Sequence, residues 1–151
     1  MKIRFCLKEY YSDKRGDFLA VQISGEAKTT YEQFVENNRA THADLLDEVA
    51  DRIYRMAQRT GIRDNFFKPQ GKNSVHSFRG TGKLRIYCLK YGSASVVLGG
   101  GGVKVVRTYQ EDEVLYKPVR LLQAIDRCLK ENEVNFADLL NYTDIEMEID
   151  V

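Results

Sequence analysis

Residues 79–109, RGTGKLRIYCLKYGSASVVLGGGGVKVVRTY, decide the fold of this 151-residue chain. Apolar and polar side chains alternate from Lys83 to Leu89, and a period of two is typical of a β-strand with one buried face. Ala94–Leu98 is more uniformly apolar, and Val103–Tyr109 alternates again. Gly99–Gly102 is expected to form a flexible connection between these two strands. Because the strands lie close together in the sequence, they predict an antiparallel meander.

Helices are predicted on both sides of this meander. Thr30, with Gln33 three residues later, is typical of a capping box and predicts a short helix. Thr41 is expected to cap a second helix that ends at Gly61. The apolar positions of this second helix recur at helical spacing and are Leu45, Leu46, Val49, Ile53 and Met56. Val114–Lys130 predicts a third helix with one apolar face.

Shorter elements complete the prediction. Ile3–Leu7 and Phe18–Ile23 predict an N-terminal hairpin, and Val75–Phe78 predicts a short strand before the meander. Asn135–Asn141 predicts a short helix, and Ile145–Ile149 alternates with acidic residues as an edge strand does. The fold class expected is therefore α+β, with two N-terminal helices and a C-terminal helix packed on a mostly antiparallel β-sheet.

Charge is distributed unevenly along the chain. Residues 61–110 hold nine Lys or Arg and one acid, a net charge of +8. Residues 111–151 hold four bases and eleven acids, a net charge of −7, so the whole chain carries only +1. Concentrated positive charge indicates a polyanionic partner such as RNA or DNA.

Several classes of protein are disfavoured by composition. No apolar run approaches the roughly 20 residues that span a bilayer, so a cytoplasmic protein without a membrane partner is expected. The three cysteines, Cys6, Cys88 and Cys128, are far apart and indicate neither a disulfide framework nor a zinc site. His42 and His76 are the only histidines, and no carboxylates cluster near either at ligand spacing. No metal ion or cofactor is expected.

Two glycine motifs suggest phosphate binding but stand in the wrong context. Phosphate-binding glycine runs precede a helix, whose N-terminus holds the phosphate. Gly80–Lys83 and Gly99–Gly102 both lead into expected strands instead. Turns are therefore the favoured interpretation of both motifs.

The remaining residues with chemical potential are basic and aromatic: His76, Arg79, Lys83, Arg85, Tyr87, Lys104, Arg107 and Tyr109. Metal-free RNA cleavage needs a base for the 2′-hydroxyl, cations for the phosphorane and an acid for the leaving oxygen. Side chains of these types supply all three, provided that neighbouring positive charge lowers the pKa of a Lys or Tyr base, or that burial lowers the pKa of a Lys base. The alternative, which spacing alone favours, is a solvated sheet face.

The stretch RGTGKLRIYCL (Arg79–Leu89), followed by an apolar strand, a glycine-rich turn, VKVVRTY and a closing helix, resembles the RelE/ParE superfamily of bacterial type II toxins. In that superfamily two N-terminal helices pack on an antiparallel sheet. Its ribosome-dependent mRNA interferases place Arg, Lys and an aromatic acid or base on the concave face of the sheet. The resemblance covers about residues 41–130 of an expected single domain, 1–151. The N-terminal hairpin and the acidic extension, 131–151, are additions to this RelE-like core.

By motif, the resemblance implies catalytic roles for Arg85, Lys104, Arg107 and Tyr109, with Tyr116 as the alternative aromatic residue. Lys83 and His76 match more weakly by position, and together with Arg79 and Tyr87 they are expected to bind RNA.

The resemblance implies a toxin component that binds RNA and acts as a metal-independent endoribonuclease on mRNA at the ribosome. A cognate antitoxin would be its protein partner. The superfamily also includes gyrase poisons and inactive relatives, so fold alone does not fix activity. The alternative is a catalytically inactive RelE-fold module that binds a protein partner through a sheet edge.

The acidic extension has two interpretations. It either folds over the basic face and masks it, or it forms a surface strand that pairs with Met1–Leu7, whose exposed face is basic. The second interpretation is the favoured one.

Overall fold

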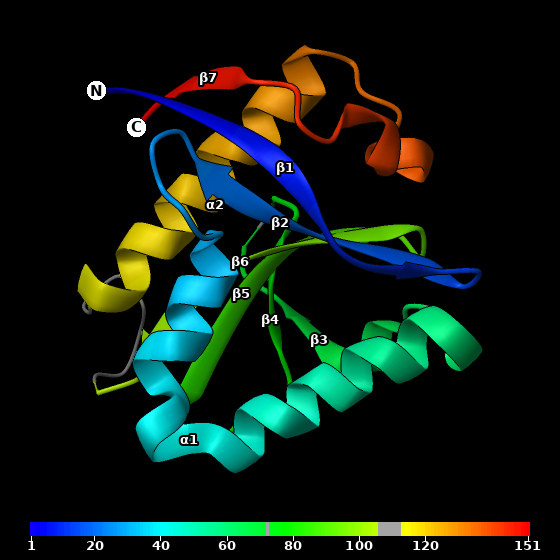
Figure 1. Ribbon diagram of the computed structural model, residues 1–151, viewed down its shortest axis with the longest axis vertical. Coiled ribbons are helices and arrows are strands. Elements are labelled where there is room, and N and C mark those ends of the chain that lie inside the picture. The colour runs from blue at the N-terminus through cyan, green and yellow to red at the C-terminus, as the bar shows by residue number, and fades with distance from the viewer. Residues whose placement is uncertain (72, 106–112) are drawn as a thin grey trace.

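The computed structural model describes residues 1–71, 73–105 and 113–151, and these residues form an α+β fold around one sheet (Figure 1). The sheet has seven strands among the described residues. Their order across the sheet is β3 (Phe67–Pro69), β4 (Val75–Phe78), β5 (Leu84–Tyr91), β6 (Ser95–Val103), β2 (Gly16–Ile23), β1 (Lys2–Asp13) and β7 (Met147–Asp150). The β2–β6 pair is parallel and the other pairs are antiparallel, which confirms the mostly antiparallel sheet, the N-terminal hairpin and, within the predicted meander, the antiparallel pairing of β4, β5 and β6.

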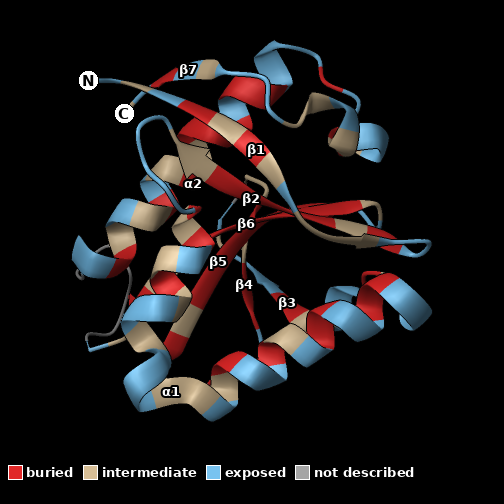
Figure 2. Ribbon diagram, viewed as in Figure 1, coloured by how far each residue is buried: buried red, intermediate tan, exposed pale blue. Residues whose placement is uncertain are grey.

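Helices cover both faces of the sheet. Helix α1 (Thr30–Arg55) packs on one face, and α2 (Glu113–Glu131) with the 3₁₀ helix Phe136–Tyr142 packs on the other. Alternation in β5 sends Leu84, Ile86 and Cys88 into the α1 core and Tyr87, Leu89 and Tyr91 into the α2 core. As Figure 2 shows, β5 and β6 are consequently buried along most of their length. The predicted alternation is confirmed, but a solvated face is wrong for Tyr87, which is 2% exposed.

The two predicted N-terminal helices form one helix with a kink. Thr29, not Thr30, is the N-cap, and it makes a capping box with Glu32. The backbone is non-helical at His42 (φ −136°, ψ 32°), next to the predicted cap at Thr41. A π-helical turn, Met56–Thr60, follows α1, and Gly61 at φ 77° ends it as predicted. A 3₁₀ turn, Asp64–Phe66, then leads into β3.

The prediction that Gly99–Gly102 connects two strands is wrong, because these residues lie within β6. Glycine is needed there since neighbours approach the strand from both faces. A Cβ atom at Gly99 would lie 2.8 Å from Leu122 of α2, and one at Gly101 would overlap the Arg85 carbonyl oxygen and lie 3.2 Å from Phe34 of α1. Between the pairs Ile86–Gly101 and Cys88–Leu98, β6 holds one more residue than β5, which is a β-bulge. Of the strand predicted to follow the glycines, 106–109 lies outside the described residues.

The acidic extension ends at the sheet edge. Strand β7 pairs with β1, so the two termini lie side by side (Figure 1). Asp150 lies 3.0 Å from the N-terminal ammonium, which lowers the pKa of its carboxyl, and Glu148 lies 3.9 Å from both Lys2 and Arg4. This arrangement confirms pairing with Met1–Leu7. The masking interpretation is wrong for the described acids of β7, because β2 and β1 separate β7 from the basic ends of β5 and β6.

We predict that Gly101→Ala destabilises the fold by about 3 kcal/mol or more, because its Cβ atom would collide with backbone that cannot rotate away. Gly100→Ala is the matched control. A Cβ atom at Gly100 would meet nothing closer than 3.9 Å, so we expect its free energy of unfolding to change by less than about 1 kcal/mol. Urea unfolding measures both values, and equal stability of the two variants would contradict the close approach at Gly101.

Candidate nucleic-acid interface

Three cations from two segments of the chain lie together where β5 begins and β6 ends. The Lys104 backbone N–H donates to the Lys83 carbonyl oxygen over 2.7 Å, and Arg85 pairs with Gly102 in the strand register. Lys83 is exposed, whereas Arg85 and Lys104 are half-buried. We call Lys83, Arg85 and Lys104 the strand-end cluster.

A tight turn presents this cluster. Gly80 and Gly82 have φ values of 75° and 60°, a left-handed conformation that glycine adopts without strain. Between them, the buried Thr81 donates its hydroxyl to the Leu84 carbonyl oxygen, and the Arg85 guanidinium donates to the Gly82 carbonyl oxygen. The strand β5 follows this turn directly, whereas a helix follows a phosphate-binding glycine loop, which supports the interpretation of Gly80–Lys83 as a turn.

None of the three cations of the strand-end cluster lies within ion-pair distance of a carboxylate among the described residues. Val105, next to the cluster, is 77% exposed, and Val114 in the first turn of α2 is 64% exposed. A Cβ atom at Gly102 would lie 3.1 Å from Val114, so the start of α2 borders the site. The arrangement can bind phosphate groups through charge-assisted hydrogen bonds.

The other predicted site residues are not all brought to this cluster. The Arg79 guanidinium donates to the Phe67 carbonyl oxygen over 3.0 Å and therefore points toward β3. The half-buried His76 pairs with Cys88, well inside the sheet, and its Nδ1 atom lies 2.8 Å from the Ser74 carbonyl oxygen. Tyr87 is buried under α2.

The remaining predicted residues lie elsewhere. Arg107 and Tyr109 lie outside the described residues. Tyr116, the alternative aromatic residue, lies half-buried in α2, with the Arg120 guanidinium 5.5 Å from its ring centre. Another cation of the basic segment, Lys90, is buried and bonds to Asp64 over 2.6 Å, which lowers the pKa of that carboxyl.

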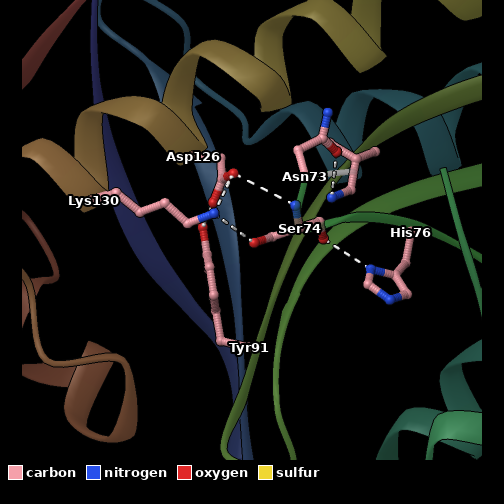
Figure 3. A network of polar contacts seen from close by, with 7 residues as sticks. Asn73, Ser74, His76, Tyr91, Asp126 and Lys130 are labelled. Atoms are coloured by element: carbon pink, nitrogen blue, oxygen red, sulfur yellow. Dashed lines mark hydrogen bonds and ion pairs between the residues drawn. The ribbon is translucent and has the colours of Figure 1, made fainter. Parts of the chain in front are cut away.

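A second polar cluster, which sequence reasoning missed, joins α2 to the sheet (Figure 3). The Asp126 carboxylate is 2% exposed and accepts hydrogen bonds from Tyr91 over 2.7 Å and from Lys130 over 3.0 Å. Lys130 also donates to the Ser74 hydroxyl over 3.2 Å. Burial and the bond to Asp126 raise the pKa of Tyr91, which keeps its proton as the donor.

The role of this polar cluster is structural and not catalytic. Among the described residues no base is directed at the Ser74 hydroxyl, because the Lys130 ammonium is a donor held by Asp126 and the carboxylate lies 3.5 Å from the Ser74 backbone nitrogen instead. A nucleophile needs an acceptor for its proton. The cluster therefore fixes α2 against β4 and β5. Its signal in the sequence is one carboxylate, Asp126, among the apolar positions of a helix.

No family model, curated protein or solved structure matches this chain. The described residues contain no group of three or more His, Cys, Asp or Glu placed to hold a metal ion. Within the same residues, no helix combines the length and the apolar content required to cross a bilayer.

We predict that Asp126→Ala lowers the free energy of unfolding by about 2–4 kcal/mol, because it leaves Tyr91 and Lys130 without their buried acceptor. Tyr91→Phe removes one of these bonds and should cost about 1–3 kcal/mol. Glu131→Ala, at an exposed position on the same helix, should change stability by less than about 0.5 kcal/mol. Urea unfolding provides the comparison, and an Asp126→Ala variant as stable as Glu131→Ala would show that the network does not hold α2.

Proposed function

We propose that this chain binds RNA through the strand-end cluster and is the toxin component of a type II toxin–antitoxin system, similar to RelE/ParE proteins. One observation carries the proposal. Lys83 just before β5, Arg85 in β5 and Lys104 just after β6 lie at adjacent strand ends, without a carboxylate partner among the described residues. Like charges brought together in this way repel each other, and a bound phosphate group relieves that repulsion.

The proposed reaction is metal-free cleavage of mRNA at the ribosome. The 2′-hydroxyl gives its proton to a general base, and its oxygen attacks the adjacent phosphorus to form a 2′,3′-cyclic phosphate. The bond to the 5′-oxygen breaks, and that oxygen takes a proton from a general acid. Arg85 and Lys104 would stabilise the additional negative charge on the phosphorane. Arg107 would position the phosphate, and Tyr109 would act as the acid or base. Support for these last two roles comes from the resemblance of the strand sequence alone.

A second candidate is the catalytically inactive interaction module, and the covered sheet favours it. Helix α1 and helix α2 occupy opposite faces, and Tyr87 is buried where the resemblance implies an open concave surface. An inactive module would present the outer edges of β3 and β7 to a protein partner. The two candidates differ in their affinity for RNA, which is experimentally accessible.

For the RNA-binding proposal we expect three phosphate contacts to give a log–log salt slope of about −2 on single-stranded RNA. The Arg85→Gln/Lys104→Gln variant should reduce the slope to about −0.7, because two contacts are lost. Lys2→Gln/Arg4→Gln is the matched control, since it changes net charge equally at the far edge of the sheet. Fluorescence anisotropy at several salt concentrations measures the slopes. A wild type without RNA affinity would contradict the proposal and favour the module.

For the cleavage step we expect induced expression to arrest growth, and Arg85→Ala or Lys104→Ala to relieve the arrest by removing a cation from the phosphate. The control variant, Lys2→Gln/Arg4→Gln, should arrest growth as the wild type does. Arrest that persists in Arg85→Ala and Lys104→Ala would contradict catalysis at this cluster.

A further inference from the structure

A second group of cations gathers at the opposite end of the β1–β2 hairpin from the chain termini. It consists of Lys14, Arg15, Arg55, Arg59 and Arg63, all exposed. Lys14 and Arg15 form the hairpin turn, Arg55 and Arg59 lie at the end of α1 and in its π-helical extension, and Arg63 follows the extension. We call these five residues the hairpin–helix patch.

Backbone contacts hold the turn against the helix end. The Arg15 backbone N–H donates to the Ala57 carbonyl oxygen over 2.9 Å, and a Cβ atom at Gly61 would lie 3.7 Å from the Arg15 carbonyl oxygen. Gln58 also donates to the Tyr11 hydroxyl over 2.5 Å. Figure 1 shows the hairpin tip beside the end of α1. Elements far apart in the sequence therefore bring together the backbone segments that carry these cations.

Few negative charges offset this patch. None of its five cations forms an ion pair with a carboxylate of the described residues. The Asp13 carboxylate accepts from the Lys14 backbone N–H over 2.7 Å and from the Tyr11 hydroxyl over 3.3 Å. Asp64 is held by Lys90. In the last turns of α1, Glu48 forms an ion pair with Arg52, and Asp51 is exposed.

Helix stabilisation accounts for only part of the patch. Cations in the last turn of a helix interact favourably with its dipole, which explains Arg55 and Arg59. It does not explain why the hairpin turn adds Lys14 and Arg15 at the same place, because each added cation increases repulsion. The π-helical turn Met56–Thr60, which carries Arg59, has an uncommon conformation. When such turns occur, they are often found at functional sites.

We infer that the hairpin–helix patch binds the phosphate backbone of double-helical RNA, as a second contact beside the strand-end cluster. Four of the five cations are arginines, whose planar guanidinium matches phosphate geometry with paired hydrogen bonds. Shape-dependent contacts to phosphates are how proteins recognise RNA duplexes. The inference deepens the proposed function and rests on it, because both take RNA as the ligand.

The surroundings of the patch favour RNA over an anionic membrane. Peripheral membrane surfaces combine cations with apolar side chains that enter the bilayer. Among the large hydrophobic side chains exposed in the described residues, only Tyr54 lies in this region. Its ring packs against Tyr11, with ring centres 4.7 Å apart, and so offers an aromatic surface next to the cations instead of an aliphatic anchor.

The test measures salt-dependent binding of the full chain to an RNA duplex of about 16 base pairs. Arg55→Gln/Arg59→Gln and Lys14→Gln/Arg15→Gln should each reduce the magnitude of the log–log slope by about 1.8 and weaken binding roughly 50-fold at about 0.1 M salt. One variant changes the end of α1 and its extension, and the other changes the hairpin turn. A loss of binding in both therefore cannot come from destabilisation of the helix alone. Circular dichroism checks that both variants fold. Lys2→Gln/Arg4→Gln is again the matched control, and its slope should equal that of the wild type.

The outcomes separate this inference from the proposed function. If both patch variants bind the duplex like the control while Arg85→Gln/Lys104→Gln loses affinity, the inference fails and the proposed function stands. If the patch variants lose duplex affinity while Arg85→Gln/Lys104→Gln binds single strands like the wild type, the strand-end proposal fails instead. A wild type that binds phosphatidylserine vesicles through the patch, but not the duplex, would overturn the inference in favour of a membrane surface.

Discussion

The structure depends on the close approach of two helices and a neighbouring strand to the glycine run of β6. This strand lies between β5 and β2, and its parallel pairing with β2 joins the meander to the N-terminal hairpin. Leu122 of α2 occupies the space above Gly99, and Phe34 of α1 lies on the Gly101 side. Side chains at these positions would push the layers apart, because protein interiors are close-packed and tolerate little added volume. The absence of Cβ atoms therefore determines how both cores assemble.

Coverage of both sheet faces limits where function can reside. The cations of residues 61–110 do not form one basic surface, because their side chains lie in different environments. Lys90 is buried beside Asp64, and Arg79 bonds to a carbonyl oxygen of β3. What stays available are strand ends and loops, where the backbone leaves the sheet and side chains reach solvent. The strand-end cluster is such a place, since Lys104 follows the last residue of β6.

Elements with a strong local pattern could be predicted from the sequence. Val75–Phe78 and the alternation of β5 were predicted, because successive side chains of a strand point to opposite faces of the sheet. The location of Gly99–Gly102 inside a strand could not be predicted, since nothing in the sequence reveals which neighbours a Cβ atom would meet. The hairpin–helix patch was missed for a related reason: Arg15 and Ala57 are far apart along the chain, and only tertiary structure brings their neighbours together. The burial of Tyr87 likewise depends on where α2 packs.

Sheet geometry also explains how a nearly neutral chain keeps distinct electrostatic surfaces. The acids of β7 are matched against Lys2, Arg4 and the N-terminus at one edge. From β7 to β5 there are four strand spacings, about 19 Å at the usual distance between neighbouring strands. Exposed charges are screened beyond about 8 Å at physiological ionic strength. The acidic edge is thus too distant to neutralise the strand-end cluster, so a net charge of +1 for the chain does not mean that opposite charges lie next to one another.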